Sequence, residues 1–251
     1  MKIRIKFRKY GTMKFIGHLD VMRYFQKAIR RADVDVCYSG GFSPHQIMSF
    51  AAPLGVGITS RGEYVDIEVA STKDSETMKK CLNGVMSEGF EIVSYRGLPD
   101  DAANAMSIVG AGDYTLAFRT GYEPEDMDKE TWFQGLIAFF ERPSVMVTKK
   151  TKGGEKEMDL KPLVYELRIC PEGDGEMEGP RLFMKISAGS AANVKPEQVL
   201  DAYYGFLGKE RPPFAFMVQR EEVYADRASD AEKEAGIHSF ISLEQLGEEI
   251  R

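Results

Sequence analysis

Hydrophobic and polar residues alternate strictly over the first ten positions, MKIRIKFRKY. Ile3, Ile5 and Phe7 share one face of an extended segment, because successive side chains of a strand point to opposite faces. The Lys and Arg residues between them share the other face. The pattern predicts an N-terminal strand with one apolar face and one basic face.

From residue 19 onward the apolar spacing changes to that of a helix. A helix is expected over residues 19–32, with an inner stripe of Leu19, Met22, Phe25 and Ile29. The elements expected next are strands over 46–51 and 63–70, a helix over 75–87 capped by Asp74 or Ser75, and a strand over 90–95. This β-α-β-β-α-β order is the ferredoxin-like plan, an antiparallel sheet with both helices on one face.

The same plan is expected to recur in the second half of the chain. The expected elements are a strand over 114–119, a helix over 129–140, strands over 144–148 and 181–187, a helix opened by Pro196 and a strand over 214–220. The segment 163–170 fits either a strand or a helix. Two polar, Gly-containing segments, 149–160 and 171–180, are expected to be loops, the first of them mobile.

The predicted fold class is therefore α+β, with two ferredoxin-like halves. The expected division is an N-terminal domain over 1–98, a second domain over 113–220, and an acidic C-terminal tail or helix over 221–251. Within that tail, Ser242-Leu-Glu-Gln245 fits a capping box that can start a terminal helix.

The composition is that of a folded soluble chain, with 43% hydrophobic and 29% charged residues among 251. No apolar run approaches the roughly 20 residues of a membrane helix, and the alternating N-terminus lacks a signal-peptide core. We therefore expect a cytoplasmic location and no membrane partner. The three cysteines form no Cys-x-x-Cys pair, so no zinc ribbon, disulfide framework or iron–sulfur cluster is expected. We predict no metal and no cofactor on this chain.

Positive charge is concentrated at the beginning of the chain. Residues 1–50 carry ten Lys and Arg against three Asp, although the whole chain has a net charge of −6. A basic segment on an acidic body predicts a surface for a polyanion such as RNA. The predicted nucleic-acid-binding residues are Lys6, Arg8, Lys14, Arg23, Lys27, Arg30 and Arg31.

Base-stacking aromatics are few on the open sheet face that RNA-binding domains of this topology use. Tyr10 and Tyr64 are the only candidates near it, and no motif that reads DNA sequence is present. The alternative interpretation of the basic strand is a ladder of cross-strand ion pairs with Asp66 and Glu68.

Two of the three histidines flank the first predicted helix in Gly- and Ser-rich segments. His18, Phe42, Ser43 and His45 form a predicted loop site. The spacing of His18, Asp20 and His45 matches no metal motif, and hydrogen bonds to loop backbone explain the two histidines equally well. His238 lies in the acidic tail and is assigned no role.

Three classes of function remain open. The leading one is a non-catalytic module that binds RNA or presents a substrate. The second is an enzyme, nuclease-like or metal-dependent, with His18, Asp20 and His45 at its centre. The third is a pure protein-docking subunit, which an exposed apolar patch around Phe42 and Leu54 would favour. No dinucleotide-binding, P-loop or Gly-x-Ser-x-Gly motif is present.

Several runs resemble a known bacterial family. They are Lys14-Phe-Ile-Gly-His-Leu-Asp20 with the basic helix after it, Tyr38-Ser-Gly-Gly-Phe-Ser-Pro-His45, Ser49-Phe50 through Pro-Leu-Gly-Val-Gly57, and Gly62-Glu-Tyr64. The family is the radical-SAM-linked domain of unknown function, found fused after radical SAM proteins or as a separate chain. The resemblance is specific over residues 1–100 and extends more weakly to about 220.

This resemblance implies a partner and no established catalytic residue. The expected partner is a radical SAM protein that carries the iron–sulfur cluster and the cofactor on its own chain. Members of the family are often encoded beside genes for the ribosome and RNA processing. The resemblance therefore implies an accessory role in RNA- or ribosome-related modification.

Overall fold

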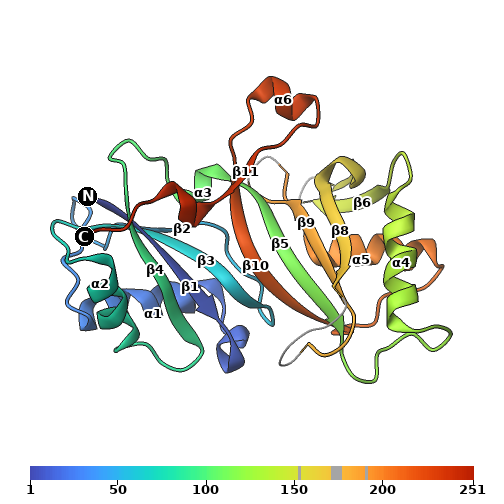
Figure 1. The fold of residues 1–251 in the computed structure, drawn as a ribbon, viewed down its shortest axis with the longest axis horizontal. Coiled ribbons are helices and arrows are strands. Elements are labelled where there is room, and N and C mark those ends of the chain that lie inside the picture. Colours follow the sequence, from blue (N-terminus) through green and yellow to red (C-terminus); the bar gives the residue numbers. More distant parts are fainter. Residues whose placement is uncertain (152–153, 171–176, 190–191) are drawn as a thin grey trace. The chain divides into compact units, whose positions relative to one another are not determined.

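The computed structural model describes residues 1–151, 154–170, 177–189 and 192–251. The described chain is a mixed α/β protein with six α-helices and a large, mostly antiparallel sheet (Figure 1). It divides into two compact units, residues 1–111 with 220–251 and residues 112–219. Among the described residues, no helix is both long and apolar enough to cross a bilayer.

The first unit contains most of the elements predicted for the N-terminal half. They are β1 (Lys2–Lys9), the 3-10 turn η1 (Gly11–Phe15), α1 (His18–Arg31), β2 (Met48–Phe50), β3 (Thr59–Glu68), α2 (Ser75–Asn83), β4 (Phe90–Leu98) and α3 (Ala105–Ile108). Its C-terminal part adds α6 (Asp230–Glu234), β11 (Phe240–Ser242) and η3 (Leu243–Leu246). Two strands, β5 (Val109–Phe118) and β10 (Phe216–Asp226), each contribute residues to both units.

Strand β1 lies between β3 and β4 and pairs antiparallel with both. The sheet order in this unit is β4-β1-β3-β10, and β2 pairs with β3 over residues 65–67. The predicted alternation in β1 is confirmed: Ile3, Ile5 and Phe7 are at most 2% exposed and pack in one core cluster with α1 and α2. The polar face of β1 is turned away from those helices.

Helix α1 forms within one residue of its predicted bounds, but its buried stripe differs from the predicted one. Val21, Phe25, Ala28 and Ile29 are buried, whereas Leu19 is 61% exposed. At 3.6 residues per turn, Leu19 lies on the side of α1 opposite Val21 and Ala28, so it faces solvent. Helix α2 begins after Asp74, whose carboxylate accepts from the Thr77 N–H at 2.9 Å, as the capping prediction required.

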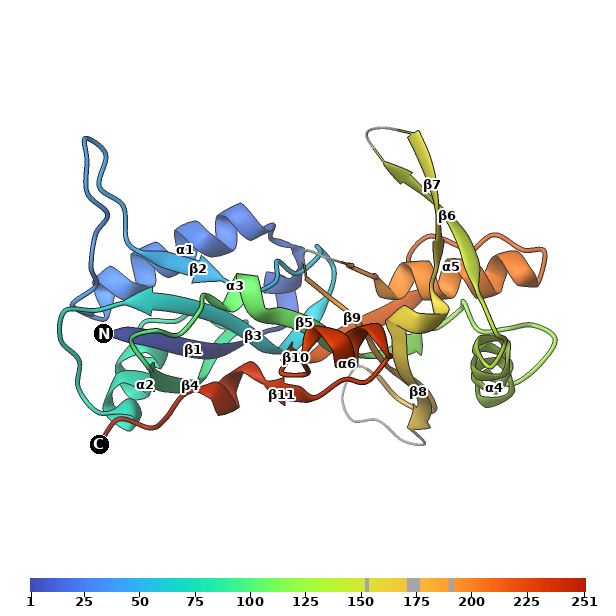
Figure 2. The same ribbon diagram turned by 90° about the horizontal axis from the view of Figure 1, so that it is seen from above.

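The C-terminal segment is part of the first unit. Strand β10 continues to Asp226, six residues beyond the predicted end at 220. The predicted capping box of Ser242 and Gln245 is present, and it opens the short 3-10 turn η3 in place of a longer helix. Figure 2 shows α1 on one side of the strands and the segment β11–η3 on the other. The face of β1 that the sequence predicted to be open is therefore covered.

The second unit has its own aromatic core. Its remaining elements are α4 (Lys129–Phe140), β6 (Met146–Thr151), β7 (Gly154–Asp159), η2 (Lys161–Leu163), β8 (Val164–Cys170), β9 (Arg181–Ser187) and α5 (Pro196–Phe206). The sheet order here is β10-β5-β9-β8. Trp132 and Phe133 of α4 pack against Phe118 and Phe216 of the sheet, at ring-centroid distances of 4.4 to 5.8 Å within the group.

The prediction of a mobile loop over 149–160 is wrong. Residues of this segment form the hairpin β6–β7, which is paired antiparallel from Met146–Asp159 to Thr151–Gly154. The segment is rich in Lys and Glu, a composition that favours a loop. The two strands are paired by backbone hydrogen bonds, which do not depend on which side chains the segment carries. The ambiguous segment 163–170 is a strand, β8. Most of the predicted acidic loop, 171–176, lies outside the described residues.

Candidate functional site

The cations of β1 form ion pairs and hydrogen bonds, most of them with residues far away in the sequence. Lys6 Nζ donates to Glu222 at 2.7 Å and to Glu244 at 3.0 Å, and its side chain is only 13% exposed. Burial alone would lower the pKa of Lys6, but the two carboxylates outweigh it and raise that pKa. Arg8 pairs with Glu91 at 3.0 Å near the surface. Of the two aromatics predicted near this face, Tyr64 is buried with its hydroxyl 2.5 Å from Glu222, and Tyr10 is exposed.

The outer face of α1 carries the cations that remain exposed. Arg23, Lys27 and Arg30 fall at spacings of four and three residues, so they share one face of the helix. Arg23 makes one long contact, 3.4 Å, with the exposed Asp20. Among the described residues, no carboxylate lies within ion-pair distance of Lys27 or Arg30. This helix face is a row of solvated positive charge.

The other predicted cations near α1 are placed differently. Arg31 lies at the end of the helix, donates to the Val85 carbonyl at 3.1 Å and lies over the Tyr24 ring. Lys14 lies in η1, with its ammonium 5.5 Å from the centroid of the exposed Phe15 ring. These two residues do not belong to the row of three.

The loop from Tyr38 to Gln46 presents an aromatic ring to solvent. Ser39 and His45 close its base: the Ser39 N–H donates to the His45 carbonyl at 2.8 Å, and the Ser39 hydroxyl lies 2.9 Å from His45 Nδ1. Between them, Gly41 adopts a φ of +98°, which an L side chain rarely adopts. Phe42, next to it, is fully exposed, and Ser43 is exposed as well. In Figure 2 the loop preceding β2 projects on the side of the strands that bears α1.

The loop and the basic helix face meet at one backbone carbonyl. The Gln26 carbonyl accepts from Arg30 Nε at 3.3 Å and from Gln46 Nε2 at 3.2 Å. Gln46 is buried and directly follows His45. The base of the loop therefore lies within one helical turn of Lys27 and Arg30. We call the three α1 cations together with the loop Tyr38–Gln46 the α1–loop surface.

His18 belongs to a different environment, beside a buried cluster of charges. Lys9 and Arg220 flank Glu63, and all three are at most 6% exposed. Arg220 Nη1 lies 3.1 Å from Glu63 and donates to the Ala52 carbonyl at 2.8 Å, while Lys9 Nζ donates to the Ile16 carbonyl at 3.0 Å. Burial lowers the pKa of His18, and the Lys9 cation lowers it further.

The cavity beside this cluster is too small for a ligand. It is lined by Lys9, His18 and Glu63 together with apolar neighbours, and its volume is about 10 Å³, which is on the order of one water molecule. Burial lowers the pKa of Lys9 and raises that of Glu63. The cluster fastens β1, β3 and β10 to the turn before α1 and to residue 52.

The structure does not bring His18, Asp20 and His45 together. His45 is adjacent to Gln46, which contacts Gln26. Gln26 lies eight positions after His18 along α1, a rise of about 12 Å. Asp20 is exposed and contacts Arg23. Within the described part of the chain, no three His, Cys, Asp or Glu side chains are placed to hold a metal ion. An exposed apolar patch around Phe42 and Leu54 would have favoured the protein-docking alternative, but Leu54 is buried.

Several residues that make buried or half-buried polar contacts were not identified from the sequence. Lys9 and Glu63 stand at positions of their strands where the alternation calls for an apolar residue. A charged residue at such a position could have indicated a buried charge cluster. No local sequence pattern indicates that Asp226 and His238 form a pair. His238 Nδ1 lies 2.7 Å from Asp226 Oδ2, and the His238 ring stacks on Phe240 at 5.2 Å. Burial would raise the pKa of Asp226, but hydrogen bonds from His238, Ser239 and Ala228 outweigh it and hold that pKa below its usual range.

Comparison with known protein families gives one match. The model of a family described as an uncharacterized protein conserved in bacteria, DUF2344, matches residues 2–196. The chain belongs to this family. The matched span of DUF2344 includes α1, the loop Tyr38–Gln46 and Glu63, and it ends at the start of α5. No curated protein matches the sequence.

Proposed function

We propose that this DUF2344 chain is a non-catalytic accessory module that binds single-stranded RNA through the α1–loop surface. One observation carries the proposal: the three cations Arg23, Lys27 and Arg30 stay exposed on one helix face. Arg4 and Lys6 of β1, by contrast, are largely buried against carboxylates. A protein that neutralises phosphates needs cations that are free to release their counterions on binding.

The exposed ring of Phe42 supports a single-stranded partner. Unstacked bases of single strands bind to aromatic rings, whereas paired bases are not accessible to them. Phe42 is fully exposed at the tip of a loop whose base is held next to the cations. The chain thus offers phosphate-binding and base-stacking groups on one surface.

We further propose that the chain acts beside a radical SAM protein, which would supply the cluster, the cofactor and the reaction. Support comes from the sequence resemblance described above. We also propose that each half is ferredoxin-like. The order of elements β1-α1-β2-β3-α2-β4 and the neighbour order β4-β1-β3-β2 support this for the first half. In the second half the neighbour order is β10-β5-β9-β8. It matches that of the first half strand for strand if the hairpin β6–β7 is treated as an insertion.

Charge reversal at two α1 positions tests the RNA-binding proposal. Lys27→Glu with Arg30→Glu should weaken binding to a single-stranded RNA oligonucleotide by about tenfold or more, because two phosphate-facing cations become repulsive. The matched control is Lys73→Glu with Lys80→Glu, which makes the same change of charge at exposed positions in and before α2. Equal effects of the two double variants, or no effect of the α1 pair, would exclude the α1–loop surface as the RNA site.

A further inference from the structure

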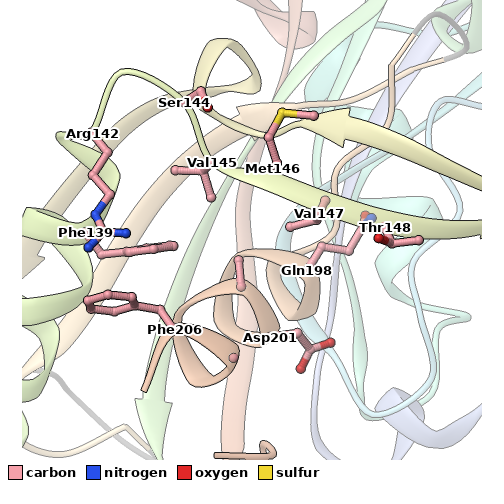
Figure 3. Close-up of a pocket in the computed structure, with 12 residues that line it drawn as sticks. Phe139, Arg142, Ser144, Val145, Met146, Val147, Thr148, Gln198, Asp201 and Phe206 are labelled. Atoms are coloured by element: carbon pink, nitrogen blue, oxygen red, sulfur yellow. The ribbon is translucent and has the colours of Figure 1, made fainter. Parts of the chain in front are cut away.

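The second unit contains a pocket that the proposed function does not use. It lies between the end of α4, the strand β6 and the helix α5, and its volume is about 530 Å³ (Figure 3). Small-molecule sites in proteins typically occupy about 300–1,000 Å³. The pocket is therefore large enough to hold a metabolite or one unit of a polymer.

One end of the pocket is built from stacked planar groups. The rings of Phe139 and Phe206 stack with centroids 5.0 Å apart and an interplanar angle of 22°. The Arg142 guanidinium lies 4.1 Å from the Phe206 centroid and 5.2 Å from that of Phe139. Phe206 is 50% exposed, so part of this wall is open to a ligand.

Arg142 supplies a positive charge that the described residues leave uncompensated. No carboxylate in the described part of the chain lies within ion-pair distance of Arg142, and its guanidinium contacts the rings of Phe139 and Phe206. Asp201, the acid that lines the pocket, already pairs with Arg211 at 2.6 Å. A guanidinium stacked on a ring keeps its N–H edge available, and that edge matches a phosphate.

Hydrogen-bonding side chains occupy the other end of the pocket. Figure 3 shows Gln198 and Thr148 close together there, away from the rings. The Gln198 side-chain oxygen accepts from the Lys195 N–H at 2.9 Å, which fixes the amide and leaves its NH₂ group as a donor. The Asp201 carboxylate, on the same helix, adds an acceptor.

We propose that this pocket binds a nucleotide, either free or as one unit of an RNA strand. The base stacks against the Arg142–Phe206 pair, its polar edge meets Gln198 and Thr148, and the phosphate pairs with the edge of the Arg142 guanidinium. A purely aliphatic ligand would leave the guanidinium unused, and an inorganic anion would leave the ring wall unused. The inference goes beyond the proposed function, because it concerns a second site and stands whether or not the α1–loop surface binds RNA.

The structure offers a variant that fills the pocket without disturbing its walls. Gly205 of α5 lines the pocket, and a Cβ built on it meets no atom within 4 Å. Gly205→Leu therefore places a side chain in the ligand space and also removes a glycine from a helix, which does not weaken the helix. Arg142→Gln removes the charge and the stacking plane. Arg168→Gln is the control, since Arg168 lies over Phe183 at 3.9 Å and does not line the pocket.

The experiment is a titration of the full chain and its three variants with AMP, GMP, CMP and UMP, by calorimetry and ligand-observed NMR. We expect at least one nucleotide to bind, Arg142→Gln to weaken it about tenfold, Gly205→Leu to abolish it and Arg168→Gln to leave it unchanged. In the Lys27→Glu, Arg30→Glu background, where the α1–loop surface is weakened, tighter binding of a tetraribonucleotide than of a mononucleotide identifies an RNA unit as the ligand of the pocket, and equal binding identifies a free nucleotide.

Two results would overturn the proposal: no binding of any of the four nucleotides at millimolar concentration, or binding that survives both Gly205→Leu and Arg142→Gln. The Lys27→Glu, Arg30→Glu double variant should bind mononucleotides like the wild type. Failure of the pocket and failure of the α1–loop surface are therefore distinguishable in the same set of proteins.

Discussion

Arg4 of β1 and Asp66 of β3 form a buried, two-pronged ion pair across the sheet. Arg4 Nε lies 2.8 Å from Asp66 Oδ1 and Nη2 lies 2.9 Å from Oδ2, with side-chain exposures of 2% and 9%. Arg4 also donates to the Leu243 carbonyl at 3.2 Å, and Asp66 accepts from the Ala105 N–H at 2.8 Å. This one pair links two strands to α3 and to the C-terminal turn η3.

Removing one partner of this pair should destabilise the protein strongly. Arg4→Met leaves the Asp66 carboxylate buried without its cation, and we expect a loss of about 3–5 kcal/mol in the free energy of unfolding. Urea denaturation measures it. Arg8→Met is the control, because Arg8 and Glu91 are each 46% exposed, and an exposed pair contributes at most about 1 kcal/mol. Equal losses in the two variants would show that the buried pair has no special role.

The Asp226–His238 pair predicts a dependence of stability on pH. The pKa of Asp226 is lower in the folded chain than in the unfolded one, so its carboxylate stabilises the fold at pH values above about 3.9. That contribution is lost as the pH falls through the folded-state pKa. Asp226→Asn cannot titrate, so the stability difference between wild type and variant should shrink as the pH falls below about 4. A difference that stays constant down to pH 2 would contradict the assignment.

His18 should titrate below the ordinary histidine value of about 6.5, because burial and the Lys9 cation both disfavour its charged form. The ring proton signals followed by NMR against pH give the pKa directly. Lys9→Met removes the neighbouring charge, so the pKa of His18 should rise while staying below 6.5. Lys79→Met, on α2, should leave it unchanged. A wild-type pKa at or above 6.5 would place His18 outside the buried charge cluster.

Phe42 should affect RNA affinity and leave stability almost untouched. The ring is fully exposed, so Phe42→Ala should change the free energy of unfolding by less than about 0.5 kcal/mol. Loss of one base-stacking ring should weaken single-stranded RNA binding by about 1–3 kcal/mol. Phe15→Ala, which removes another exposed aromatic ring, is the comparison. Identical affinities of wild type and Phe42→Ala would remove the loop from the proposed surface.

Local sequence patterns were sufficient to predict many of the elements. The alternation in β1, the bounds of α1 and the Asp74 cap depend on residues a few positions apart, and all three are found in the structure. The hairpin β6–β7 was missed, because its pairing is made by backbone groups of a Lys- and Glu-rich segment. The composition favoured a loop there, but backbone hydrogen bonding stabilises a two-stranded hairpin instead.

The candidate site could be predicted only in part, for a related reason. The sequence placed Lys6 on the polar face of β1, but it could not show that Glu222 and Glu244, more than 200 residues away, occupy that face. For α1, helical spacing identified Arg23, Lys27 and Arg30 as an outer face, and all three are exposed. Their connection to the loop through Gln26 and Gln46 depends on tertiary contacts that no local pattern carries.

The central claim is that cations of α1 bind RNA phosphates, and the salt dependence of RNA binding tests it most directly. For a single strand, the slope of log affinity against log salt concentration is about −0.7 per phosphate neutralised. Three α1 cations predict a slope of about −2 for wild type, and the Lys27→Glu, Arg30→Glu variant should have a slope nearer zero. A wild type with no affinity at low salt, or one whose affinity is independent of salt, would contradict the account.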